Sequence, residues 1–138
     1  ATALRISQVF GAGDVDRGVL AAFARSARSG EPIRVSGRGV AVRDYVEAAE
    51  VARVVRLALE HPAPSPVYNV GGGGRTIAEL AQAAALAFGR PVTDVVHTDV
   101  ADEDTSFWSL DSSLAERELG WRPARSLADA LAARAAQA

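Results

Sequence analysis

The sequence predicts an α/β fold, because short apolar segments typical of strands alternate along the chain with segments typical of amphipathic helices. The clearest unit is the run Val-Tyr-Asn-Val at 67–70, which a glycine-rich loop separates from a helix start at Thr76. Other segments carry apolar residues at the i, i+3, i+4 and i+7 spacing of a helix face. The chain has 138 residues, of which 49% are hydrophobic, so we expect one compact domain.

The first third of the chain predicts a strand, a helix and a second extended piece. The segment from Leu4 to Phe10 is apolar and partly alternating, and the Gly-Ala-Gly at 11–13 closes it as a turn. The helix that follows is expected to end at Gly30, before an extended piece at 33–35. Its apolar face is formed by Val19, Leu20, Phe23, Ala24 and Ala27.

The middle of the chain predicts a turn and two further helices. The glycines at 37–39 form the turn, and the amphipathic helix after it ends at 61–62. That helix presents one apolar face, made of Val51, Val54, Val55, Ala58 and Leu59. The next helix opens with a capping box between Thr76 and Glu79 and stops at Gly89.

The last part of the chain predicts one more strand and two helices. A short strand is expected at 92–96, and the acidic stretch at 99–104 is interpreted as a solvated loop. A short helix at 113–119 ends at Gly120, and Ser126 caps a final alanine-rich helix.

Composition excludes several classes of function. The net charge is -2 and the 15 basic residues, all arginine, are scattered, so no nucleic-acid partner is expected. The chain lacks cysteine, and His61 and His97 have no ligand spacing, which excludes a disulfide framework and a thiolate metal site. No apolar run reaches the roughly 18 residues of a membrane span and no signal peptide is visible, so we expect a cytoplasmic protein without a membrane partner. The chain enters strand-like sequence within a few residues, which indicates a piece of something longer.

Neither glycine-rich loop matches the G-x-G-x-x-G fingerprint of a dinucleotide site. A pattern that starts at Gly11 puts the anionic Asp16 at the third glycine, and one that starts at Gly71 puts Thr76 there. We therefore interpret both loops as turns. No base lies at a spacing that suggests a nucleophile partner, so no catalytic residue is assigned.

Four motifs occur in an order that is much more specific than any one of them alone. They are R-I-S-Q-V-F-G at 5–11, G-E-P-I-R-V-S-G-R-G-V-A-V-R-D-Y-V at 30–46, V-Y-N-V-G-G-G at 67–73 and D-S-S-L-A-E-R-E-L-G-W-R-P at 111–123. Over nearly its whole length the chain thus resembles the C-terminal half of the extended short-chain dehydrogenase/reductases, the NAD-dependent nucleotide-sugar epimerases, dehydratases and ketoreductases.

The resemblance implies that residues 1–138 form one partial domain with two roles. The segments at about 2–10 and 66–89 would supply late strands of a Rossmann-type sheet. The segments at about 30–60 and 92–138 would mostly build the small C-terminal substrate-binding domain.

In this family NAD or NADP is bound mainly by an N-terminal half, which carries a glycine fingerprint and a catalytic Tyr-x-x-x-Lys pair. This chain has neither, because Tyr45 and Tyr68 are followed at the fourth position by Ala49 and Gly72, and lysine is absent. The resemblance therefore implies a missing N-terminal catalytic segment as a partner of this chain.

The resemblance also assigns the residues around the expected ligand, a nucleotide-sugar-like small molecule. Arg43, expected at the start of the helix after the 37–39 turn, would clamp the substrate diphosphate, a role suited to a planar guanidinium. Asp44 would accept from backbone amides at the helix entrance or hold Arg43. The alternative is an ordinary surface Arg-Asp pair.

Further positions carry over from the family one at a time. Gln8 stands where an asparagine usually contacts the sugar nucleotide, Val35 would flank the base, and Ser7 is the expected cofactor contact. Asp104 matches an acid that reaches a ribose hydroxyl, and Trp108 a nearby aromatic site.

One departure from the family lies directly before Asp104. Where the family has Arg-Pro-Gly-Asp, this chain has Ala-Asp-Glu-Asp at 101–104, which removes a second phosphate-binding arginine and adds negative charge. Like charge in a partly desolvated site is unfavourable, so the departure favours an atypical member or a non-sugar substrate.

Three functions remain open from the sequence. The first is the substrate-binding C-terminal portion of an NAD(P)-dependent nucleotide-sugar epimerase, dehydratase or ketoreductase. The second is a non-catalytic binding or regulatory remnant of the same fold. The third is an interaction module that associates through open strand edges, for example as a homodimer.

Overall fold

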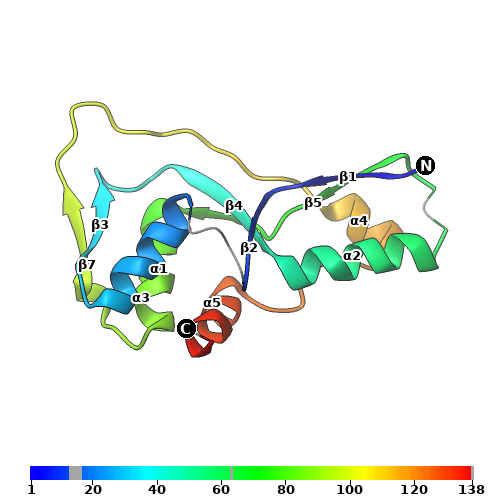
Figure 1. Cartoon of the computed structure of the whole chain (residues 1–138). Coiled ribbons are helices and arrows are strands. Elements are labelled where there is room, and N and C mark those ends of the chain that lie inside the picture. Colours follow the sequence, from blue (N-terminus) through cyan, green and yellow to red (C-terminus); the bar gives the residue numbers. More distant parts are fainter. Residues whose placement is uncertain (13–16, 63, 138) are drawn as a thin grey trace.

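The computed structural model describes residues 1–12, 17–62 and 64–137, and its alternating strands and helices confirm the predicted α/β class (Figure 1). The strands are β1 (Ala3–Ile6), β2 (Gln8–Phe10), β3 (Ile33–Ser36), β4 (Val42–Glu47), β5 (Val67–Val70), β6 (Gly74–Thr76) and β7 (Val95–Thr98). The α-helices are α1 (Val19–Ser29), α2 (Ala48–Glu60), α3 (Ile77–Ala87), α4 (Ser113–Leu119) and α5 (Leu127–Ala136). Within the described ranges no helix is long and apolar enough to cross a bilayer.

The strands form three small sheets. β1 pairs with β5 and β3 pairs with β7, both in parallel. β4 is the centre of the third sheet, with β2 parallel on one edge and β6 antiparallel on the other. The prediction of one continuous strand from Leu4 to Phe10 is therefore wrong. The chain changes sheet at Ser7, so β1 and β2 pair with different partners.

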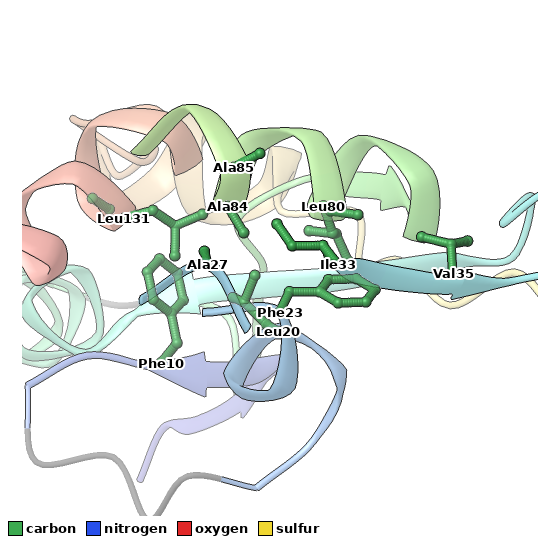
Figure 2. Packing of buried hydrophobic residues seen from close by; sticks show 12 residues of the cluster. Phe10, Leu20, Phe23, Ala27, Ile33, Val35, Leu80, Ala84, Ala85 and Leu131 are labelled. Carbon is green, nitrogen blue, oxygen red and sulfur yellow. The ribbon is translucent and has the colours of Figure 1, made fainter. Parts of the chain in front are cut away.

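One hydrophobic cluster fills the space between α1, α3, α5 and β3. Phe10 and Phe23 belong to it, together with Ile33 and Leu80, which are fully buried (Figure 2). The apolar face predicted for α1 is confirmed, because all five of its residues are buried or partly buried in this region. Removing such apolar surface from water is the main favourable term in folding.

A second cluster holds α2 and α4 against β1 and β5, at the other end of the molecule (Figure 1). Its largest member, Trp121, is fully buried and donates from Nε1 to the carbonyl of Glu50 at 3.2 Å. Within the 66–89 segment, β5 belongs to this cluster whereas α3 belongs to the first one.

The segment Val42–Glu47 is a strand, which corrects the expectation that Arg43 and Asp44 stand at the mouth of a helix. Their neighbours alternate between buried and partly buried positions, the period of a strand between two partners. Val42, Tyr45 and Val46 are residues that favour strands. The helix starts only at Ala48.

A second correction concerns the strand expected at 92–96. Val92–Asp94 form one turn of 3-10 helix, and β7 starts only at Val95. The predicted capping box is confirmed, since Thr76 Oγ1 accepts from Glu79 N–H at 3.1 Å and Glu79 Oε2 accepts from Thr76 N–H at 2.8 Å. α4 ends at Gly120, also as predicted, and Gly120 adopts the left-handed conformation.

Candidate functional site

A cavity of about 430 Å³ opens where the chain bends between β1 and β2. The long connection at 99–112 runs from β7 across the molecule to α4 and supplies its other wall (Figure 1). A volume of this order accommodates a small organic ligand. The lining residues are Ile6, Ser7, Gln8, Arg43, Asp44, Trp108, Ser109 and Leu110.

Arg43 is held in the cavity wall by hydrogen bonds on one side of its guanidinium. Nη1 donates to the carbonyl of Val42 at 2.8 Å and to Ser106 Oγ at 3.0 Å, and Nη2 donates to Asp104 Oδ2 at 2.7 Å. Nε has no acceptor among the residues that the structure describes. The side chain is 22% exposed, so the guanidinium is held in place while part of the side chain stays accessible.

Asp104 is the ion-pair partner of Arg43. Its Oδ1 accepts from Ser106 N–H at 2.9 Å, while Oδ2 receives Arg43. Hydrogen bonds from Ser106 are the main cause that lowers the pKa of Asp104 below its ordinary value, and Arg43 lowers this pKa further. The structure therefore joins the expected phosphate residue to the expected ribose residue, and half of the Asp104 side chain remains exposed.

Asp44 does not contact Arg43. It is 4% exposed, and its carboxylate accepts from Gly72 N–H at 2.7 Å and from Leu110 N–H at 2.9 Å. It thus connects the glycine loop to the 99–112 segment, which supplies part of the cavity wall. The expectation that Asp44 binds amides is confirmed, but they belong to these two segments and not to a helix entrance.

The glycine loop at 71–74 is a packed connection and not a phosphate cradle. Gly71 N–H donates to Ser112 Oγ at 2.8 Å and Gly72 N–H donates to Asp44, so both donors are used within the protein. A Cβ added at Gly72 would overlap the carbonyl oxygen of Tyr45. This agrees with the interpretation of the loop as a turn. In the other loop, Gly13 and Asp16 lie outside the described residues.

Three of the remaining expected residues line the cavity. Ser7 lines the cavity, and its buried Oγ has no hydrogen-bond partner in the described part of the chain. Gln8 is exposed at its rim, and Trp108 is 68% exposed. Val35 is not brought to the cavity, because it is 1% exposed in the first hydrophobic cluster.

The acidic stretch before Asp104 carries its own counter-ion. Glu103 Oε2 accepts from Arg38 Nε at 2.8 Å, and the hydrogen bond from Arg38 is the main reason that the pKa of Glu103 is lowered. The extra negative charge of this stretch is therefore partly neutralised at the 37–39 turn. This weakens the like-charge argument that the sequence raised against an anionic ligand.

Sequence reasoning missed the residues that support Arg43 and Asp44 from the 99–112 segment. Ser106 receives Arg43, while Ser109 Oγ and Leu110 N–H face Asp44. The only local signal for these residues was the run Ser-Phe-Trp-Ser at 106–109. It could not show their partners, which lie more than 60 residues away in the sequence. The described residues contain no group of three histidine or carboxylate side chains that could hold a metal ion.

Comparison with known proteins places the chain in a family. Residues 1–71, just over half of the chain, match the model of the NAD dependent epimerase/dehydratase family. The chain belongs to this family. Its relatives include epimerases, dehydratases and reductases of dTDP- and UDP-sugars.

Individual relatives agree in both sequence and fold. A dTDP-6-deoxy-L-talose 4-dehydrogenase (NAD(P)(+)) of Kitasatospora kifunensis is 34% identical over 93% of this chain and 43% of its own length. The structure of a UDP-N-acetylglucosamine 4-epimerase from Bacillus cereus superposes with a TM-score of 0.82 at 24% identity, over 97% of this chain and 44% of that one. A UDP-glucose 4-epimerase from Thermotoga maritima, solved with UDP-glucose, gives a TM-score of 0.74 at 33% identity, over 95% and 43%.

The family member therefore has the expected α/β fold, which matches one part of Rossmann-type extended short-chain dehydrogenase/reductases. The chain spans less than half the length of the relatives that it matches.

Proposed function

We propose that this chain forms the substrate-binding side of an NAD(P)-dependent enzyme that modifies nucleotide sugars. The observation that carries the proposal is Arg43, a guanidinium fixed in a cavity wall with Nε free of protein acceptors in the described structure. Such a group binds a phosphate oxygen without first having to be ordered, so less side-chain entropy is lost on binding.

The other cavity residues take roles that match the parts of such a ligand. Arg43 binds the diphosphate, and the amide of Gln8 at the rim donates to the sugar or its phosphate. Trp108 offers an exposed ring face for an apolar or planar part of the ligand. Asp104 has lone pairs left for a ribose hydroxyl, since each carboxylate oxygen can accept more than one hydrogen bond. Val35 has no role in this proposal because it is buried elsewhere.

NAD or NADP fits one position of the cavity. The buried Oγ of Ser7 lacks a partner within the described residues, and unpaired buried hydroxyls are uncommon, which supports a polar atom of the cofactor as its partner. When bound, the cofactor would accept or supply a hydride at a sugar carbon. This chain would orient the substrate, and a separate segment would carry most of the cofactor contacts and the catalytic acid-base pair.

Calorimetric titration with UDP, dTDP and their sugars tests the proposal. The wild-type protein and Arg56→Ala, an exposed control on α2, should bind at least one of these ligands. Arg43→Ala should bind it at least about tenfold more weakly, because a charge-assisted hydrogen bond to phosphate is lost. A wild type that binds none of the ligands, or an Arg43→Ala protein that binds as well as wild type, would contradict the proposal.

A further inference from the structure

Two arginines are cross-strand neighbours in the three-stranded sheet. β4 and β6 are antiparallel, and Arg43 is directly opposite Arg75 in their register. Side chains of directly opposite residues emerge on the same face of a sheet. Like charges in this arrangement are destabilising, so the pair is unfavourable unless something neutralises it.

The two side chains are neutralised to very different degrees. Arg43 is paired with Asp104, whereas Arg75 is exposed and makes one hydrogen bond, from Nη1 to the carbonyl of Gly74 at 3.1 Å. No carboxylate of the described residues forms an ion pair with Arg75. Glu79, four positions further along, accepts from Thr76 N–H in the capping box instead. Arg75, beside Arg43, therefore has no carboxylate counter-ion within the described residues.

The backbone of β6 lies against the cavity wall. A Cβ at Gly74 would come within 3.1 Å of Ser109 Oγ, and Ser109 lines the cavity together with Arg43. Arg75 follows Gly74 and, by the alternation of a strand, projects from the opposite face of β6, the face that it shares with Arg43. Its exposed side chain is long and flexible enough to cover the space in front of this cross-strand neighbour. Its single hydrogen bond to a main-chain carbonyl is weak enough to exchange for a phosphate oxygen.

The charge balance at the cavity creates a need for a second cation. Asp104 offsets the charge of Arg43, and Asp44 adds a further carboxylate to the lining. The diphosphate of a nucleotide sugar brings about two negative charges, which one compensated arginine does not balance. The sequence also lacks an arginine at 101–103, immediately before Asp104.

We propose that Arg75 is a second phosphate-binding residue, which closes over the diphosphate from β6 while Arg43 binds it from β4. This inference rests on the proposed function, because it concerns the same ligand. Arg75 determines specificity for the number of phosphates: it favours nucleoside diphosphates and their sugars over nucleosides, without contacting the base.

The test compares Arg75→Gln with Arg75→Lys and with the control Arg56→Gln, in titrations with UDP, dTDP, the two nucleosides and inorganic pyrophosphate. Arg75→Gln should weaken the binding of diphosphates and pyrophosphate about five- to twentyfold and make that binding less dependent on salt. Its affinity for nucleosides should stay unchanged. Lys keeps the charge and should lie between Gln and wild type. Thermal melting checks that each variant is folded.

The outcomes separate this inference from the proposed function. If wild type and Arg75→Gln bound a diphosphate with equal affinity, this result would overturn the role of Arg75 and leave the proposed function standing. A wild type that binds no diphosphate would overturn both. Equal loss of nucleoside and diphosphate affinity in Arg75→Gln would also contradict the inference, because it would indicate a general disturbance of the site.

Discussion

Asp44 Oδ1 lies 2.7 Å from the backbone nitrogen of Gly72, and Asp44 Oδ2 lies 2.9 Å from that of Leu110. One buried carboxylate therefore joins a strand, a glycine loop and the segment that crosses the molecule. Hydrogen bonds to a charged acceptor are stronger than those between neutral groups. Loss of this acceptor would leave two backbone donors without a partner.

Asp44→Ala should lower the free energy of unfolding by about 2–4 kcal/mol, because two partly buried N–H groups lose their acceptor. Asp44→Asn keeps one acceptor oxygen and should lose about half as much. Urea denaturation followed by circular dichroism measures both values. If the alanine variant were as stable as wild type, the carboxylate would not hold these segments together.

Gly72→Ala should destabilise the protein by about 3 kcal/mol, since the new methyl group would overlap the carbonyl oxygen of Tyr45 and force the backbone to move. Gly89→Ala is the matched control. Gly89 has φ +70° but open space around it, so only the left-handed conformation costs energy, about 1 kcal/mol. Thermal or urea unfolding ranks the two variants, and a larger effect at Gly89 would refute the packing argument.

The Tyr68–Glu118 hydrogen bond should make the free energy of unfolding depend on pH in the acidic range. Tyr68 OH, in a fully buried side chain, donates to Glu118 Oε2 at 2.6 Å, and this bond is the first cause that lowers the pKa of Glu118 below its ordinary 4.5. A carboxyl with a lowered folded-state pKa contributes stability above its unfolded pKa, and this contribution is lost as the pH falls through the folded value.

Tyr68→Phe should therefore be less stable than wild type near neutral pH and lose less stability between about pH 5 and about pH 3. The pKa of Tyr68 itself is raised above 10, mainly by burial, so its own contribution is lost only as the pH rises past that value. Urea unfolding at several pH values gives both slopes. Parallel pH profiles for the two proteins would mean that Glu118 gains nothing from Tyr68.

Asp104→Asn should bind nucleoside diphosphates severalfold more tightly than wild type. The amide keeps an oxygen for Ser106 N–H and for a ribose hydroxyl, but it removes a negative charge 2.7 Å from Arg43. Titration with UDP and with uridine separates the two effects, because only the diphosphate should gain affinity. Weaker binding of both ligands would instead indicate that Asp104 is needed mainly to position Arg43.

Local patterns predicted most helices correctly. The apolar face of α1 and the capping box of α3 depend on residues within a few positions of each other, and the structure has both. β4 was missed because three of its six residues, Arg43, Asp44 and Glu47, are charged, and charged residues are not typical of a central strand. The split of Leu4 to Phe10 into two strands depends on which neighbours each half pairs with.

The sequence by itself determined the α/β class, the family motifs and the side chains that carry the chemistry, because these depend on residue type and short spacing. Only the tertiary structure decided what each side chain meets: Arg43 pairs with Asp104, Asp44 binds Gly72 and Leu110, and Val35 is buried in the core. The physical reason is that cross-chain hydrogen bonds and packing join residues far apart in sequence, and no local pattern specifies those partners.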